Sequence, residues 1–259
     1  TATSLTSTAT FTEDLTLFTG TSTSTITTAG TGAISVTGGQ GANTVTISTA
    51  STAANSVIVT GGAAADTISV TDTGVFATGG NIVINGGAGA DKVTLVTADH
   101  TNAVSVVTLT VNPTQSNVGA ADQVTGFYVT ASTRKVDTID FAGSAIKPAS
   151  GVASTAVTGE SLTSLAFSVT TAGLLAFTGT KATALTAAQV ENIWTTQIST
   201  LLNNLETVVW ADANTADTQY GNSLVFNHNI LGDSEVILVG VQATATGAAA
   251  ATANLVGIA

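Results

Sequence analysis

The sequence predicts a mainly β protein: a β-roll or β-solenoid, followed by a smaller carboxy-terminal domain that is α+β or β-sandwich-like and has one helix. Three observations support this fold class. A glycine doublet recurs in the amino-terminal part, segments of alternating Val, Ile and Thr flank each doublet, and one downstream segment has helical spacing. Because one such unit cannot bury its apolar face alone, neighbouring units are expected to stack.

The repeated units read ISVTGGQGANTVTIS, VIVTGGAAADTISV and IVINGGAGADKVTLV. Their doublets begin at Gly38, Gly61 and Gly86, and the steps between them are 23 and 25 residues. Each unit predicts a strand, a turn and a second strand, since the side chains alternate with a period of two. The threonine-rich residues 21–36 are expected to supply a preceding coil or cap. Asp122 precedes an apolar strand without a doublet and marks a degenerate coil.

The domain boundary is placed where the glycine-rich repeats give way to glycine-poor alternating segments. This change predicts a repeat domain with an amino-terminal cap over 1–145 and a carboxy-terminal domain over 146–259. The helix is predicted at 185–206, where apolar residues recur at helical spacing. Thr186 and Gln189 form the pattern of a capping box at its start. Further strands are expected at 162–169, 173–178, 222–229 and 233–242.

Composition excludes several classes of function. The formal net charge is −11 with only five lysines and arginines, which disfavours binding to nucleic acid. There is no cysteine, so disulfides and thiolate metal sites are impossible. No run of about 18 apolar residues occurs, and we expect no membrane insertion. No zinc-protease, nucleophile-elbow or P-loop motif is present, so we expect no enzymatic activity.

Three pairs of carboxylates could suggest glycoside hydrolysis: Glu13 with Asp14, Asp212 with Asp217, and Asp233 with Glu235. The low aromatic content, at 5%, favours solvated loop charges instead. Trp194 and Trp210 are interpreted as core anchors rather than as a carbohydrate platform.

The turns have the composition of a cation site. In GGAGAD the glycines allow backbone conformations that aim carbonyl oxygens into the turn, and the final aspartate adds a hard anionic oxygen. Calcium takes about six to eight oxygens, more than one turn provides. We therefore expect Asp66 and Asp91 to flank one Ca²⁺, and Asn43 with Asp66 to flank another. The expected carbonyl ligands are those of Gly39, Gly41, Gly62, Gly87 and Gly89.

Two features of the turns leave alternatives open. Ala64 stands where the third glycine of the motif is expected, and Asn43 supplies a neutral oxygen and so a weaker site. The other interpretation is a tight turn whose aspartate caps its own backbone. Repetition in register favours calcium over that interpretation.

These residues resemble the RTX calcium-binding nonapeptide, G-G-x-G-x-D-x-U-x with U apolar. Residues 86–94 match it throughout, and 61–69 and 38–46 depart from it once each. The segments GNSLVFNHN and DSEVILVGVQ are similar to the closing part of RTX-type surface-layer proteins secreted by type I systems. The resemblance implies an uncleaved carboxy-terminal secretion signal, calcium-triggered folding outside the cell and assembly into a lattice.

The leading functional expectation is an extracellular structural protein of the bacterial cell surface. Its subunits would self-assemble with calcium into a surface layer or filament. The expected partners are further copies of the chain and cell-surface polysaccharide. Two alternatives stay open: the RTX and secretion portion of a larger type-I-secreted enzyme or toxin, and an adhesin.

Overall fold

A computed structural model describes residues 2–4, 11–17, 19–28, 32–49, 56–72, 81–97, 106–112, 115–129, 137–145, 148, 150–158, 164–217, 221–243 and 254–257. The largest sheet has nine strands, in the spatial order β1 (Ala2–Ser4), β3 (Ser22–Thr28), β5 (Asn43–Thr49), β7 (Thr67–Asp72), β9 (Lys92–Thr97), β11 (Asp122–Thr125), β18 (Ser234–Val239), β17 (Ser223–Asn227) and β16 (Thr207–Ala211). The second sheet has seven, in the order β19 (Asn254–Gly257), β12 (Thr138–Ala145), β10 (Val106–Thr110), β8 (Asn81–Gly87), β6 (Ser56–Gly62), β4 (Ile34–Thr37) and β2 (Phe11–Asp14).

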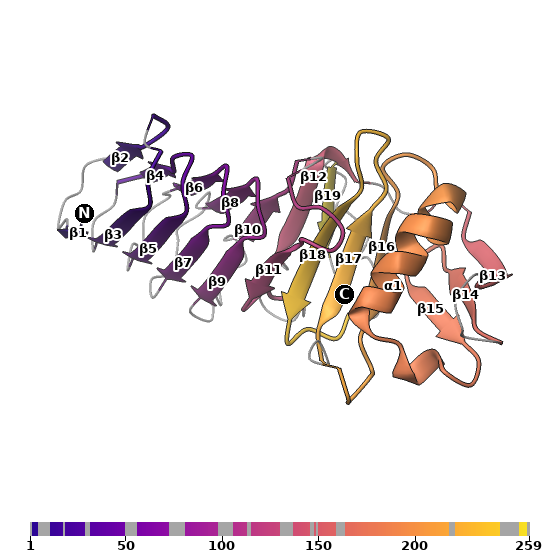
Figure 1. Ribbon diagram of the computed structural model, residues 1–259. Coiled ribbons are helices and arrows are strands. Elements are labelled where there is room, and N and C mark those ends of the chain that lie inside the picture. Colours follow the sequence, from indigo (N-terminus) through magenta and orange to yellow (C-terminus); the bar gives the residue numbers. More distant parts are fainter. Residues whose placement is uncertain are drawn as a thin grey trace.

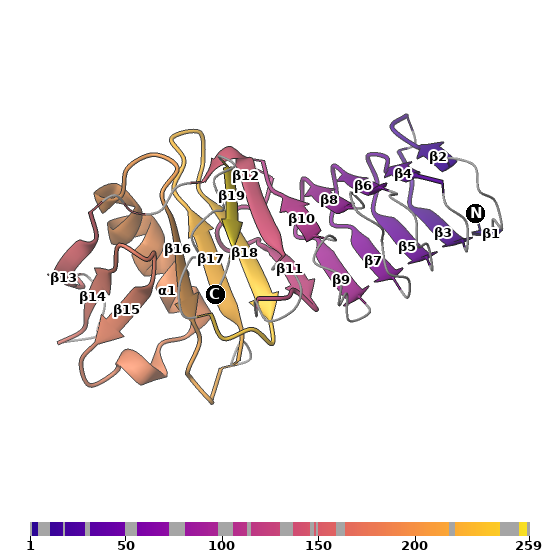
Figure 2. The ribbon, with the colours of Figure 1, turned by 180° about the vertical axis from the view of Figure 1, so that it is seen from behind.

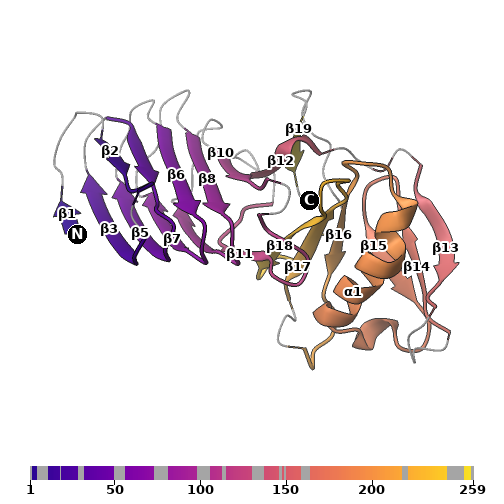
Figure 3. The same ribbon diagram turned by 45° about the horizontal axis from the view of Figure 1, so that its top comes forward.

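Successive coils of the chain stack in parallel along these two sheets, as Figures 1 and 3 show. Each coil gives one strand to each sheet, and the neighbouring coil pairs with it in parallel. Ile34 lies opposite Val57, and Val57 lies opposite Ile82, which reproduces the 23- and 25-residue steps of the glycine doublets. The mainly β fold with β-solenoid-like stacking predicted from the repeats is thus confirmed.

A single apolar core fills the space between the sheets of the repeats. Alternate residues of each strand point inward, and Val36, Ile47, Ile68 and Ile84 are fully buried. The intervening residues, mostly threonine, serine and valine, face outward and are at least partly exposed. This alternation is the burial pattern of a strand with one covered face.

The carboxy-terminal part continues the same sheet. β11 pairs in parallel with β18, while β17 and β16 add antiparallel strands beyond it. Strands β16–β18 are buried on both faces. On one face Val209, Val225 and Val236 extend the solenoid core, and the other face belongs to a second apolar cluster. On the seven-stranded sheet, β19 pairs antiparallel with β12 (Figure 2). Both sheets therefore run across the predicted boundary at residue 145.

A helical segment covers the outer face of β16–β18. It consists of α1 (Ala187–Ile193), the π-helix η2 (Trp194–Ile198) and the 3₁₀-helix η3 (Ser199–Leu201). The capping box of Thr186 and Gln189 is present, as predicted. The segment ends before the predicted residue 206, because Leu202 is extended and Leu205 has a φ of +75°. The indole ring of Trp194 stacks on Phe226 with centroids 4.7 Å apart, so Trp194 is a core anchor.

Three antiparallel strands lie at the far end of the molecule (Figure 1): β13 (Val152–Ala156), β14 (Ala166–Val169) and β15 (Leu175–Thr178). The short 3₁₀-helix η1 (Ala182–Ala184) follows them. Phe167 and Leu175 join the core around the helical segment. Among the described helices, none has both the length and the apolar composition needed to cross a bilayer.

Candidate functional site

A ladder of buried aspartates runs along the edge of the repeats where each chain turn enters the nine-stranded sheet. Asp66 and Asp91 directly precede β7 and β9, and Asp122 begins β11. All three side chains are buried. Each coil donates its main-chain N–H to the carboxyl of the next coil: Asn43 to Asp66 Oδ1 at 2.6 Å, Asp66 to Asp91 Oδ1 at 2.7 Å, and Asp91 to Asp122 Oδ1 at 3.0 Å.

The two ends of this ladder are closed by hydroxyl groups. Ser22 Oγ donates to Asn43 Oδ1 at 2.6 Å, and the Asp122 N–H donates to Ser116 Oγ at 2.7 Å. Ser116 Oγ in turn donates to the Glu235 carbonyl at 2.6 Å, which ties the last coil to β18. The ladder therefore joins the repeats to the carboxy-terminal part.

The glycine doublets are explained by the close approach of successive turns. A β-carbon on Gly38 would overlap the Gly61 carbonyl oxygen, and one on Gly61 would overlap the Gly86 carbonyl oxygen. At the second position, a β-carbon on Gly62 would overlap the Gly39 oxygen. Only glycine lets the main chains stack this closely, so the doublet recurs at the spacing of the coils.

At the position that faces the first glycine of each doublet, one turn has an amide nitrogen and the other two have a carboxyl oxygen. Asn43 Nδ2, Asp66 Oδ2 and Asp91 Oδ2 each face the first glycine of their own turn. Asn43 Nδ2 donates there to three oxygens: the Gly41 carbonyl at 2.8 Å, Asp66 Oδ1 at 2.9 Å and the Gly39 carbonyl at 3.3 Å. In the other two turns the position holds a buried carboxyl oxygen that has no hydrogen-bond partner among the described residues.

The electrostatics of the ladder follow from this burial. Desolvation raises the pKa of Asp66, while hydrogen bonds from Asn43 and Gly62 oppose the rise. Burial, together with the charge of Asp66, raises the pKa of Asp91 to about 6. Burial and the charge of Asp91 raise the pKa of Asp122 to about 7. Stacked carboxylates without a cation are therefore costly at neutral pH.

The predicted ligands are brought together in part. Asp66 and Asp91 lie on adjacent rungs, as expected, and their Oδ2 atoms are the orphaned acceptors that a hard cation would satisfy. The carbonyls of Gly39 and Gly41 accept from Asn43, and that of Gly62 accepts from the Ala88 N–H at 2.8 Å. Gly87 and Gly89 have φ values of +95° and +128°, the left-handed backbone that the turn requires.

No cluster of three or more histidine, aspartate or glutamate side chains suited to a metal occurs within the described ranges. An ion at the turns would thus take one carboxyl from each of two coils and complete its shell with main-chain oxygens and water. That donor set is all oxygen and fits calcium.

Two carboxylates predicted to be solvated are instead buried. Glu235 and Asp212 have no exposed surface, so that interpretation of both is wrong. The sequence offered a signal for Glu235, which is followed directly by four apolar residues in the strand SEVILV. Asp233 accepts hydrogen bonds from Trp194 Nε1 at 2.9 Å and from the Asn229 N–H, and its Oδ1 lies 2.8 Å from His228 Nδ1. It fixes a hairpin.

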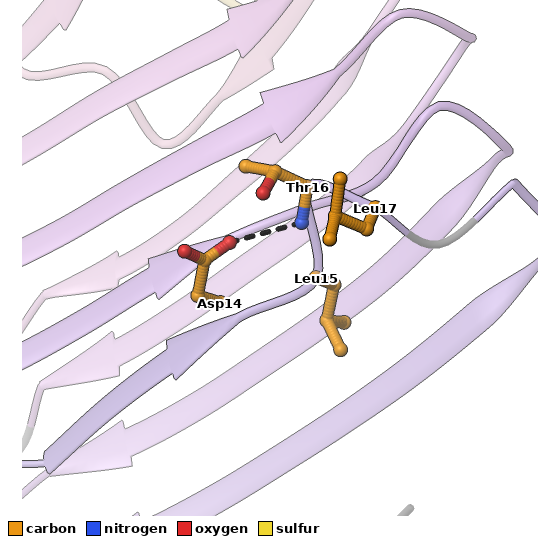
Figure 4. Close-up of a pocket in the computed structure, with 4 residues that line it drawn as sticks. All are labelled: Asp14, Leu15, Thr16 and Leu17. Atoms are coloured by element: carbon orange, nitrogen blue, oxygen red, sulfur yellow. Dashed lines mark hydrogen bonds between the residues drawn. The ribbon is translucent and has the colours of Figure 1, made fainter.

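Surface hollows lie at two places in the described part of the chain. One follows β2 and is lined by Asp14, Leu15, Thr16 and Leu17 (Figure 4). The Thr16 N–H donates to Asp14 Oδ1 at 2.9 Å, a local turn. The other lies between β15 and β16 and includes Phe177 and Trp210, whose rings meet edge to face. The first is lined equally by polar and apolar residues, and the second mainly by apolar side chains.

The fold and the ladder define a mainly β protein with parallel sheets, β-solenoid-like stacking and a line of buried aspartates. Comparison with protein-family models, with curated proteins and with solved structures gave no match.

Proposed function

We propose that the chain is an extracellular structural protein whose calcium-stabilised repeats serve self-assembly at a bacterial cell surface. The observation that carries the proposal is the repeated, buried carboxyl oxygen without a partner at Asp66 and Asp91. Two such oxygens on adjacent coils are the arrangement that a bridging divalent cation satisfies. The RTX-like sequence of the same turns agrees with calcium.

Calcium would act through linkage in this proposal. The folded turns hold Asp66 and Asp91 on adjacent coils, whereas an unfolded chain does not, so the ion stabilises the stacked state. It also neutralises the charge that the ladder concentrates at one edge. The Asn43 turn already has an amide nitrogen among its oxygens, so the proposal places the ion at Asp66 and Asp91.

The ends of the stack support self-association. β1 and β2 are the outermost strands of their sheets at the amino-terminal end, and each pairs with one described strand only. At the other end, β16 makes a parallel bridge from Val209 to Leu174, so its edge is partly covered. An uncovered strand edge pairs readily with another chain. The proposed contact between subunits therefore uses the amino-terminal edges.

Negative-stain electron microscopy of the purified chain tests both parts of the proposal. Samples in about 10 mM calcium, a concentration that saturates weak extracellular sites, are compared with samples in EGTA. Ordered sheets or filaments that disappear in EGTA are expected. Dispersed particles in both conditions would contradict self-assembly, and equal order in both would contradict the role of calcium.

A matched pair of variants locates the ion. Asp91→Asn removes an orphaned ladder oxygen, while Asp140→Asn removes a half-buried carboxyl outside the turns. Each removes one negative charge. We expect Asp91→Asn to raise the calcium concentration at half-assembly about tenfold or more, equivalent to about 1.4 kcal/mol, and Asp140→Asn to leave it unchanged. Equal effects would show that the ion acts through net charge and not through the turns.

A further inference from the structure

A second pair of carboxyls lies where the last coil meets the carboxy-terminal part, away from the glycine turns. Glu235 extends from β18 and Glu191 from α1, and both reach Gly119 in the loop that precedes β11. The Gly119 N–H donates to Glu235 Oε2 at 3.0 Å. Glu191 Oε2 lies 3.7 Å from the position that a β-carbon on Gly119 would take. Three segments distant in sequence thus converge on one point.

The carboxyl of Glu235 is only half satisfied at this point. Glu235 has no exposed surface, and its Oε1 has no hydrogen-bond partner in the part of the molecule that the structure describes. Within the described part of the chain, no lysine or arginine forms a salt bridge with Glu235 or Glu191. A buried carboxyl with an unpaired oxygen beside a second carboxyl is costly unless a proton or a cation lies between them.

The surroundings of Gly119 leave room for such a ligand. Gly119 has a φ of +82°, and among the described residues other than its two chain neighbours only Glu191 Oε2 comes within 4 Å of its β-carbon position. Glu191 is half-buried, which gives the site a path to solvent. The donors are carboxylate oxygens, which are hard ligands suited to calcium rather than to softer metals.

We infer that Glu191 and Glu235 bind a divalent cation, with calcium the best fit, that clamps α1 and β18 to the loop at Gly119. Two carboxyls provide up to four oxygens, and water with main-chain carbonyls completes the shell. The site is independent of the glycine turns and shares no ligand with them. Its ion would lock the carboxy-terminal part to the end of the solenoid.

A shared proton is the alternative to a cation for stabilising the carboxyls of Glu191 and Glu235. Burial, followed by the charge of Glu191, raises the pKa of Glu235 to about 8, although the Gly119 N–H opposes the rise. Burial and the charge of Asp217 raise the pKa of Glu191. Without metal the pair therefore holds a proton at neutral pH, and calcium must displace it.

Counting bound calcium by equilibrium dialysis at pH 8 tests the inference. Glu235→Gln keeps an oxygen that accepts from the Gly119 N–H, and Glu191→Gln changes a half-buried position. Glu206→Gln is the control, since Glu206 is also buried but both of its oxygens accept hydrogen bonds from Asn203 at 2.9 Å. Melting curves in EGTA establish that each variant folds.

We expect Glu235→Gln and Glu191→Gln each to bind one ion fewer than the parent chain, and Glu206→Gln to bind the same number. An unchanged count in both would overturn the inference and leave a shared proton. If Glu235→Gln does not fold, the count for Glu191→Gln decides. Asp91→Asn separates the two sites: a loss there without a loss in Glu235→Gln supports the turns alone, and the reverse supports the junction alone.

Discussion

The repeats and the carboxy-terminal part bury their residues by different means. In the repeats, equivalent residues of successive coils lie directly beside one another, so a carbonyl of a neighbouring coil limits what Gly38, Gly61 and Gly62 accommodate. In the carboxy-terminal part, residues from distant segments meet once, as Trp194 does with Phe226. A stacked glycine of the repeats, such as Gly61, therefore tolerates less change than an open turn glycine of the carboxy-terminal part, such as Gly221.

The two parts also bury carboxyls in different ways. The ladder places Asp66, Asp91 and Asp122 in line, so each charge acts on the next. At the junction, Glu235 and Glu191 form one isolated pair. The first arrangement follows from repetition, whereas the second depends on how β18 and α1 pack.

Two glycine substitutions should give the largest contrast. Gly61→Ala should destabilise the protein by about 3 kcal/mol or more, because its β-carbon would overlap the Gly86 carbonyl oxygen. Gly221→Ala should cost about 1–2 kcal/mol, because its φ of +86° is strained for alanine but nothing lies within 4 Å. Urea unfolding of both variants measures the difference. Similar losses would show that stacking of the turns adds no special constraint.

The pH dependence of stability in EGTA should also separate the two parts. The folded-state pKa values of Asp91, Asp122 and Glu235 are raised to about 6, 7 and 8, so between pH 4 and 8 the folded chain holds more protons than the unfolded chain. Stability should therefore be greatest at acidic pH and should fall as pH rises through these values.

Single substitutions should each remove part of this fall in stability with rising pH. Asp91→Asn should flatten the fall at its acidic end, up to about pH 6, and Glu235→Gln should flatten it towards pH 8. Thermal melts of the parent and both variants, recorded across this range in EGTA, give the comparison. A parent chain whose stability rises from pH 5 to pH 8 would contradict the burial of these charges.

The smallest expected effect sharpens the difference within the ladder itself. Asn43→Asp replaces the Nδ2 donor with a carboxyl oxygen, as in the other two turns. In EGTA it should lower stability by about 1–3 kcal/mol, because the Gly41 carbonyl loses its donor and a second charge faces Asp66. In calcium it should bind one additional ion. Equilibrium dialysis checks the count, and an unchanged number would contradict the equivalence of the three turns.

Local pattern was enough to predict the stack and most of its turns. The 23- and 25-residue steps fixed the register, and the place of Asp66 and Asp91 in adjacent coils followed from it. The capping box at Thr186 was also predictable from the sequence, because it depends on two residues that are three positions apart. The hydrogen bonds from one coil to the carboxyl of the next were not foreseen, since they depend on the separation of the main chains.

The parallel, repetitive half of this protein follows from its local pattern, because a strand period of two and a nearly constant step between coils are properties of the chain. That the same sheet continues through β18, β17 and β16, and that Glu235 is buried beside Glu191, became evident from the folded structure alone. The pairing of β11 with β18 and the bond from Gly119 to Glu235 each join residues more than 100 positions apart, and the bond spans 116 positions. No local sequence period predicts contacts between residues so far apart, because they depend on how the whole core packs.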